Sequence, residues 1–157
     1  FYHAFYDSPS FDILPGLGTC FAKLVRSTES SDQLAALVVQ DSELTAVATP
    51  AMSLFHLRDG SIRDLFGPTS HERLVPFGHN ETTSQIEPLV VGRARLSLGD
   101  TVVVLPRQSA ARLRPSRLQR IIRHGGTPAA IARRLGRRRG GAIPVIVLHM
   151  TVIRSSE

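Results

Sequence analysis

Short apolar runs separated by polar turns fill the first two thirds of the chain, and their alternation has the period of two that β-strands require. The clearest signal is Asp59-Gly60, which stands between two such runs and is typical of a two-residue hairpin turn. Short connections between these runs predict an antiparallel meander. The strands expected in this part cover residues 20–26, 35–40, 44–48, 53–58 and 61–65.

Loops interrupt this pattern at the start of the chain and again before its last third. Residues 66–88 are rich in proline and glycine, which prevent a long regular element there. Strands are expected at residues 89–98 and 101–105, and Gly92 in the first of them marks a candidate β-bulge. Prolines and a glycine also predict an irregular N-terminal arm over residues 1–16.

The last third of the chain changes to the period of amphipathic helices. Thr127 and Pro128 are a typical N-cap and first-turn pair for the second of two helices, and a last strand is expected over residues 143–150. Strands, two helices and a returning strand predict an α+β fold, an antiparallel β-sandwich with flanking helices. We expect one domain over residues 17–150 and a tail over residues 151–157. The helical i, i+3, i+4 stripe that precedes Thr127 consists of Leu118, Ile121 and Ile122.

The composition is that of a globular protein and excludes several classes. The chain has 157 residues, of which 42% are hydrophobic and 20% charged. No apolar run approaches the roughly 20 residues of a membrane-spanning helix, so no membrane association is expected. The single cysteine, Cys20, cannot form an internal disulfide or a zinc finger and is expected in the core. This cysteine usage favours the cytoplasm or another reducing intracellular compartment.

Charge is distributed unevenly along the chain. Residues 1–100 contain 7 basic and 12 acidic side chains, whereas residues 101–157 contain 12 arginines and one acid, Glu157. A solvated helix face is one interpretation of the arginines, and binding of an acidic protein or of nucleic acid are the others. No aromatic residue follows Phe77, which weakens the nucleic-acid interpretation. The candidate anion- or partner-binding residues are Arg133, Arg134, Arg137, Arg138 and Arg139.

Four segments, in this order, resemble a known family. Leu17-Gly18-Thr19 looks like a Gly-Ser/Thr-Thr strand opening, and residues 44–60 look like a strand, a Gly-Asp-Ser-Arg turn, a strand and an Asp-Gly turn. Residues 98–105 resemble a Pro-Gly-Asp strand that leads to Ser-Asp-Gly, and residues 127–148 a closing helix and strand. The chain thus resembles the later two thirds of protein phosphatase 2C-like domains, the PPM-type metal-dependent Ser/Thr phosphatases. The resemblance implies their sandwich fold, with the N-terminal part absent from this chain.

The positions that the resemblance assigns to metal-binding aspartates hold other residues here. Such phosphatases use carboxylates to bind two divalent metals, because Mg²⁺ and Mn²⁺ prefer oxygen ligands. The aligned positions are Ala51, Arg107 and Gly141. The side chain of Arg107 adds a positive charge that would repel a cation. No catalytic residue, metal ligand or cofactor is therefore expected, and we interpret the chain as a pseudophosphatase that acts as a protein-binding or regulatory module.

Two alternative functions stay open at this point. The first is an active metal-dependent Ser/Thr phosphatase, with Mg²⁺ or Mn²⁺ held by ligands in an N-terminal part outside this chain. The second is a nucleic-acid-associated protein that uses the arginine-rich C-terminal half. The partner in the favoured interpretation is another protein subunit, or a missing segment of the same chain, with an acidic surface.

Neither the histidines nor Asp100 indicates a separate active site. His56 and His149 lie in expected strands, where a hydrogen-bonded structural role is favoured, and Asp100 is expected to form a turn. His71-Glu72 and His79-Asn80-Glu81 are weak candidates for metal ligands, since no aspartate or cysteine accompanies them.

The strands are apolar enough to need burial on both faces. Helices that cover one sheet in the family have no counterpart in the sequence, so we expect a partner or another segment to cover that sheet. The residues on which this expectation rests are Val38, Val47, Val103 and Val145.

Overall fold

A computed structural model describes residues 16–17, 20–21, 33–67, 73–74, 89–138 and 141–151. The strands are β1 (Ala35–Gln40), β2 (Glu43–Ala48), β3 (Met52–Arg58), β4 (Ser61–Asp64), β5 (Arg73–Leu74), β6 (Leu89–Arg95), β7 (Thr101–Pro106), β8 (Arg137–Arg138), β9 (Gly141–Ala142) and β10 (Ile146–His149). The helices with complete bounds are α3 (Arg107–Ala110), α4 (Pro115–Arg123) and α5 (Pro128–Gly136).

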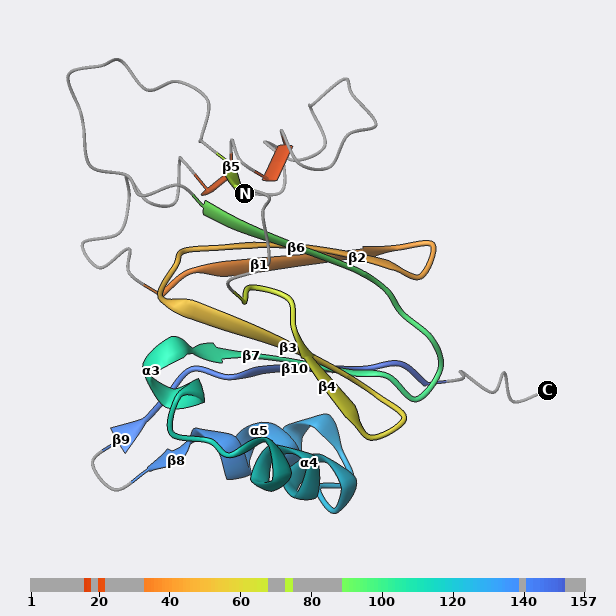
Figure 1. Cartoon of the computed structure of the whole chain (residues 1–157), viewed down its shortest axis with the longest axis vertical. Coiled ribbons are helices and arrows are strands. Elements are labelled where there is room, and N and C mark those ends of the chain that lie inside the picture. The colour runs from red at the N-terminus through yellow and green to blue at the C-terminus, as the bar shows by residue number, and fades with distance from the viewer. Residues whose placement is uncertain are drawn as a thin grey trace.

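Two antiparallel sheets face each other, which confirms the predicted α+β sandwich. Sheet A has the order β1-β2-β6-β5 and sheet B the order β10-β7-β3-β4. Figure 1 shows sheet A above sheet B, with α4 and α5 packed beneath sheet B. β1, β2, β3 and β4 lie where the sequence pattern predicts them, and the β3–β4 hairpin turns at Asp59-Gly60.

The predicted meander is wrong, because β2 belongs to sheet A and β3 to sheet B. A tight turn at Pro50 separates them, closed by the hydrogen bond from the Met52 N–H to the Thr49 carbonyl oxygen, 3.1 Å long. After that turn the chain enters the other sheet instead of pairing with β2. Alternation determines which face of a strand is apolar, but it does not determine which neighbour the strand pairs with.

Gly92 does not form the predicted bulge. The register of β2 with β6 is continuous from Glu43↔Arg95 to Ala48↔Val90, with Gly92 opposite Ala46. A Cβ atom on Gly92 would lie 3.0 Å from Cε1 of Phe66 and 3.1 Å from Cδ2 of Leu54. Glycine is needed here because side chains of the opposite layer approach the strand backbone closely.

Apolar side chains fill three layers, the first of them between the sheets. This central layer contains Leu54 and Val104 of sheet B and Ala46 of sheet A, all at most 1% exposed. Leu65 and Phe66, which follow β4, also pack into it. The two sheets are therefore held together by a continuous apolar core.

The outer face of sheet A is covered by residues of the same chain. Leu17 and Phe21 pack against Val47 and are each 1% exposed. Residues 16–17 and 20–21 are helical, so the strand predicted over residues 20–26 is wrong at its start, and the arm expected over residues 1–16 has a helical last residue. Val47 is fully buried by these contacts, whereas Val38 of β1 is half-buried.

The outer face of sheet B is covered by α4 and α5, as predicted. Leu118, Ile131 and Leu135 pack with Val103 of β7, and each is at most 5% exposed. The Thr127 hydroxyl accepts a hydrogen bond from the Ala130 N–H, 3.2 Å long, and caps α5 as expected. The short α3 helix and the β8–β9 hairpin were not predicted. None of the described helices is long and apolar enough to span a membrane.

Candidate functional site

Two of the positions aligned with metal-binding aspartates meet at one end of the sandwich. β3 begins and β7 ends there, with Met52 paired to Pro106. The residues just outside this pair are Ala51 and Arg107, and the Arg107 N–H donates a 2.7 Å hydrogen bond to the Ala51 carbonyl oxygen. The structure therefore brings together two residues that are separated by more than fifty positions in the sequence.

The side chain of Arg107 spans this end of the molecule. Its Nη2 atom donates a 3.0 Å hydrogen bond to the carbonyl oxygen of Phe66, which follows β4. The third aligned position, Gly141, begins β9 and pairs with Arg138 of β8. At the end of the sandwich where the resemblance places metal ligands, the aligned residues offer a methyl group, a guanidinium and a glycine.

These residues do not fit a divalent metal ion. Mg²⁺ and Mn²⁺ require several oxygen ligands, usually with negative charge, and none of the three residues has a side-chain oxygen. A guanidinium so close to a metal would oppose its charge. Within the described part of the chain, no group of three or more His, Cys, Asp or Glu residues is arranged to hold a metal ion.

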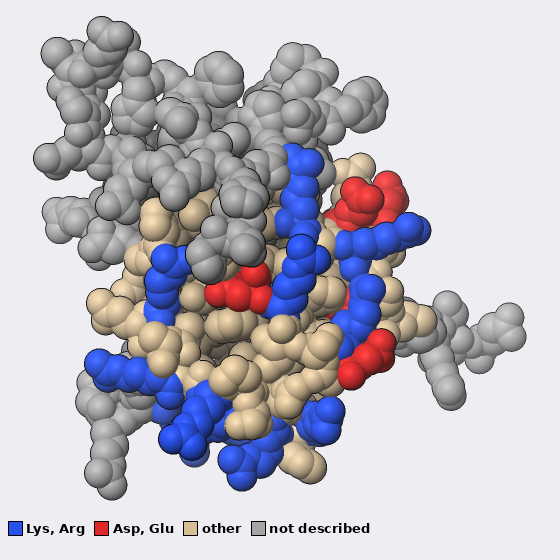
Figure 2. Space-filling view, viewed as in Figure 1, with Lys and Arg blue, Asp and Glu red and all other residues tan. Residues whose placement is uncertain are grey.

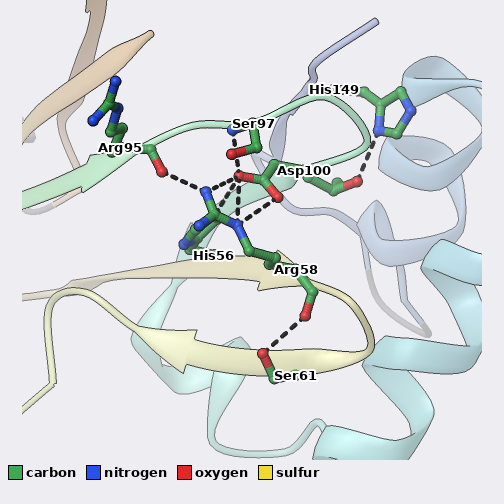
Figure 3. Close-up of polar contacts among 8 residues, drawn as sticks. His56, Arg58, Ser61, Arg95, Ser97, Asp100 and His149 are labelled. Atoms are coloured by element: carbon green, nitrogen blue, oxygen red, sulfur yellow. Dashed lines mark hydrogen bonds and ion pairs between the residues drawn. The ribbon is translucent and has the colours of Figure 1, made fainter.

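A buried carboxylate occupies the opposite end of the sandwich. Asp100 is 2% exposed and precedes β7, where the chain passes from sheet A to sheet B. Arg58 donates to it from Nη2 at 2.7 Å and from Nε at 3.0 Å, and His56 Nε2 lies 2.9 Å from its Oδ2. The Ser97 N–H donates a fourth contact at 2.8 Å. Figure 3 shows these groups converging on one carboxylate, and we call the four residues the Asp100 cluster.

The environment of Asp100 keeps it charged. Burial by itself would raise the pKa of this carboxyl, but the hydrogen bonds from Arg58, His56 and Ser97 outweigh burial and hold the pKa well below its usual range. In the same pair, the hydrogen bond to Asp100 raises the pKa of the Arg58 guanidinium. Within the Asp100 cluster, Arg58 and Asp100 thus form an ion pair. The geometry of the cluster suits a structural role better than proton transfer.

The sequence predicted the turn at Asp100 but missed its partners. The alternation of side chains along β3 could have indicated these partners. His56 and Arg58 lie on the same face of the strand as the core residues Met52 and Leu54. The His56 side chain is 11% exposed, and a polar side chain buried at the end of an apolar face needs a hydrogen-bonding partner. Arg58 Nη2 also donates 2.6 Å to the Arg95 carbonyl oxygen of β6, so the cluster joins the two sheets.

The remaining histidine predictions have separate outcomes. His56 and His149 are hydrogen-bonded within strands, as expected, and His149 Nδ1 lies 2.8 Å from the Thr101 hydroxyl. His71-Glu72 and His79-Asn80-Glu81 lie outside the described residues. Cys20 is buried, as predicted.

The helices carry the basic surface that the sequence predicts. Arg133, Arg134 and Arg137 are exposed, while Arg139 and the side chain of Arg138 lie outside the described residues. Figure 2 shows arginines along the lower edge of the molecule, over α4 and α5, and acidic residues only higher on this face. We call the exposed arginines of α4 and α5 the basic helix surface: Arg117, Arg120, Arg123, Arg133 and Arg134.

Comparison with known proteins places this geometry among phosphatase folds. The serine/threonine phosphatase PstP/Ppp of Mycobacterium tuberculosis is similar over 96% of this chain and 78% of its own, with a TM-score of 0.62 and 16% identity. The PPM Ser-Thr phosphatase MsPP from Mycobacterium smegmatis, in complex with cacodylate, gives a TM-score of 0.61 and 16% identity over 95% of this chain and 78% of its own. The chain has the PPM-type phosphatase fold.

A third structure supports the same fold. The phosphatase domain of the cell fate determinant SpoIIE from Bacillus subtilis is similar over 96% of this chain and 70% of its own, with a TM-score of 0.55 and 16% identity. No protein-family model and no curated protein sequence matches the chain. The PPM-type fold is therefore established by structure at low sequence identity, and a fold does not determine an activity.

Proposed function

We propose that this chain is a PPM-fold domain without phosphatase activity that serves as a protein-binding or regulatory module. The observation that carries the proposal is Arg107, which meets Ala51 at the end of the sandwich aligned with the metal site of active phosphatases. Loss of a ligand lowers metal affinity, whereas a guanidinium at a ligand position also opposes the charge of the metal.

The neighbourhood of Arg107 supports the same conclusion. The guanidinium donates to the Phe66 carbonyl oxygen, and the Arg107 main chain is bonded to Ala51, so both ends of the residue are fixed by local contacts. Ala51 and Gly141 supply no carboxylate that could compensate. In two-metal enzymes the metal ions activate the water that hydrolyses the phosphoester. The three aligned positions provide no ligand for such metal ions.

A phosphatase assay tests the inactive state. We expect no hydrolysis of an aryl phosphate or a phosphopeptide in millimolar Mn²⁺ beyond that of the buffer. The variant Arg107→Asp should stay inactive, because one carboxylate does not provide the several ligands that a two-metal site requires. Hydrolysis that a chelator abolishes would overturn the proposal and favour the active phosphatase with ligands elsewhere in the protein.

The charge of the basic helix surface points to an acidic protein as the partner. Its five arginines are exposed, and the sequence contains no Asp or Glu between Thr101 and Ser156. Guanidinium groups bind carboxylates through paired hydrogen bonds, and complementary charge also accelerates the encounter. The described part of this surface contains no aromatic side chain on which a nucleic-acid base could stack.

Binding of a poly-glutamate peptide and of a DNA duplex with equal charge separates the two kinds of partner. We expect tighter binding of the peptide, and a loss of about tenfold or more when Arg133→Glu and Arg134→Glu are combined. Arg63→Glu combined with Arg95→Glu is the matched control, because it reverses the same number of exposed arginines, on β4 and β6. Tighter binding of the duplex, or an equal loss in the control, would contradict the acidic-protein proposal.

A further inference from the structure

A cavity of about 340 Å³ opens beside the Asp100 cluster, at the end of the sandwich away from Arg107. It lies between the β3–β4 hairpin, the turn before β7, the end of β10 and the facing parts of α4 and α5. Its size falls within the range of small-molecule sites, about 300–1,000 Å³. None of the three positions aligned with metal ligands lines it.

The cavity has an apolar side formed by one residue from each packed element. Leu57 of β3 and Ile131 of α5 are 7% and 2% exposed, and Ile122 of α4 packs in the same cluster. These side chains belong to the apolar layer between sheet B and the helices. A ligand with a ring or a short aliphatic group would bury apolar area against them.

Most polar groups of the cavity are already paired with other groups of the protein. Arg58 is bonded to Asp100, and the Gln119 amide donates to the Gly60 carbonyl oxygen. Thr101 and His149 are bonded to each other through Nδ1 of the histidine. These pairs hold the rim of the cavity in place, and the last of them fixes the His149 ring.

Arg123 and Asp59 are the exceptions among the polar side chains of the cavity, and of the two only Arg123 has the charge that attracts an anion. Its guanidinium lies against Gly60, where a Cβ atom would collide with it, and the arginine is exposed. It forms no hydrogen bond or ion pair with any residue in the described part of the chain. His149 likewise has no described partner at Nε2. Among the residues that line the cavity, a cation and a ring nitrogen therefore have no partner in the described part of the chain.

We propose that this cavity binds a small organic anion, with its carboxylate or phosphate on Arg123 and His149 and its apolar group on Leu57, Ile122 and Ile131. Arginine binds either anion with paired hydrogen bonds, and the apolar side selects ligands that carry a hydrophobic group. The site is independent of the aligned metal positions and of the inactive state proposed above.

Phenyl phosphate is the probe, and nuclear magnetic resonance titration of the whole chain is the measurement. Three glycines line the cavity, Gly60, Gly99 and Gly126, and their amide signals report binding at this place. We expect saturable shifts of these signals with phenyl phosphate. Phenol, which lacks the anion, and inorganic phosphate, which lacks the ring, should each bind at least about tenfold more weakly.

Substitutions on one helix distinguish this site from general attraction to a basic protein. Arg123→Gln should weaken the binding of phenyl phosphate by about tenfold or more, since a charged hydrogen bond is lost. Arg117→Gln on the same helix should leave it unchanged, because Arg117 is exposed and does not line the cavity. Unchanged amide signals of β1 and β2, which lie in the other sheet, show without ligand that each variant is folded.

Three results would overturn the proposal. They are the absence of saturable glycine shifts at millimolar phenyl phosphate, equal binding of phenyl phosphate and inorganic phosphate, and equal weakening by the Arg117 and Arg123 variants. None of these results depends on the outcome of the phosphatase assay. Failure of the cavity proposal and failure of the proposed function can therefore be distinguished.

Discussion

The Asp100 carboxylate is expected to stabilise the folded state. It accepts hydrogen bonds from Arg58 and from the Ser97 N–H, and it lies beside His56. Its main chain is bonded as well, since the Met150 N–H donates 3.0 Å to the Asp100 carbonyl oxygen. Removing the charge would leave buried donors without their acceptor, which costs more than the pair contributes when intact.

The variant Asp100→Asn should therefore lower the free energy of unfolding at pH 7 by about 1–3 kcal/mol. The folded-state pKa of Asp100 is depressed, so its charged form stabilises the native state above the unfolded pKa of about 4. This contribution is lost as the pH falls below that value toward the folded-state pKa. Urea unfolding at pH 7 and at pH 3 should show the difference between variant and wild type shrinking at the lower pH.

Asp41→Asn provides the comparison for this experiment. Asp41 is an exposed turn residue with a φ of 49°, a conformation that asparagine also adopts. Its substitution should change the free energy of unfolding by less than about 0.5 kcal/mol. If both variants behave alike at pH 7, the Asp100 cluster does not stabilise the fold.

Gly92 illustrates a different restriction at the scale of one residue, because here space and not charge selects the side chain. Gly92→Ala should reduce the free energy of unfolding by about 1–3 kcal/mol, since the new Cβ meets Phe66 and Leu54 at 3.0 and 3.1 Å. Phe66→Leu in the same molecule should recover part of this loss. Denaturant titration of the two single variants and the double variant measures the coupling, and strict additivity would exclude the close approach.

At the scale of elements, α4 and α5 separate an apolar stripe from a basic face. Leu135→Ala on α5 should lower the free energy of unfolding by about 2–5 kcal/mol, because the side chain is 5% exposed and packs on sheet B. Arg133→Ala, on the exposed face of the same helix, should change it by less than about 0.5 kcal/mol. Thermal or urea unfolding compares the two, and equal losses would show that α5 is rotated about its axis.

The elements also show which local signals could be recognised. Thr127-Pro128 predicted the start of α5 because capping and first-turn geometry depend on adjacent residues only. The helical residues 16–17 and 20–21 were missed, although Leu17, Cys20 and Phe21 have the i, i+3, i+4 spacing of a buried helix face. The alternation of residues 20–26 competed with that spacing, and contact with sheet A favours the helix.

At the scale of the whole molecule, local patterns predicted the elements but not their assembly. The β3–β4 hairpin followed from Asp59-Gly60, whereas the passage from sheet A to sheet B at Pro50 depends on which strands pair later. The meeting of Ala51 with Arg107 was implied only by the family resemblance. The cavity beside Asp100 could not be predicted, because α4, α5, β3 and β10 form it together.

The burial of the three apolar layers gives a prediction for the oligomeric state of the chain. The large apolar side chains that are exposed in the described part belong to three different elements, β1, the turn after β6 and β10: Val39, Leu98 and Ile146. Isolated exposed side chains of this kind do not drive association. Light scattering at several concentrations should therefore give the mass of one chain, 17.1 kDa, without binding of a hydrophobic dye. A concentration-dependent increase in mass would identify an apolar interface that these layers do not account for.

The crossing of the chain between sheets at Pro50 has a consequence for the order of folding. The hairpins β1–β2 and β3–β4 pair residues that are close in sequence, but the central pairings join Ala46 with Gly92 and Leu54 with Val104. Neither sheet can be completed until the segment from β6 to β7 arrives, and loop closure over such separations is slow. A nascent chain that ends before Leu89 would contain two hairpins with no strand to join them into sheets, so the sandwich forms only after most of the chain has been synthesised.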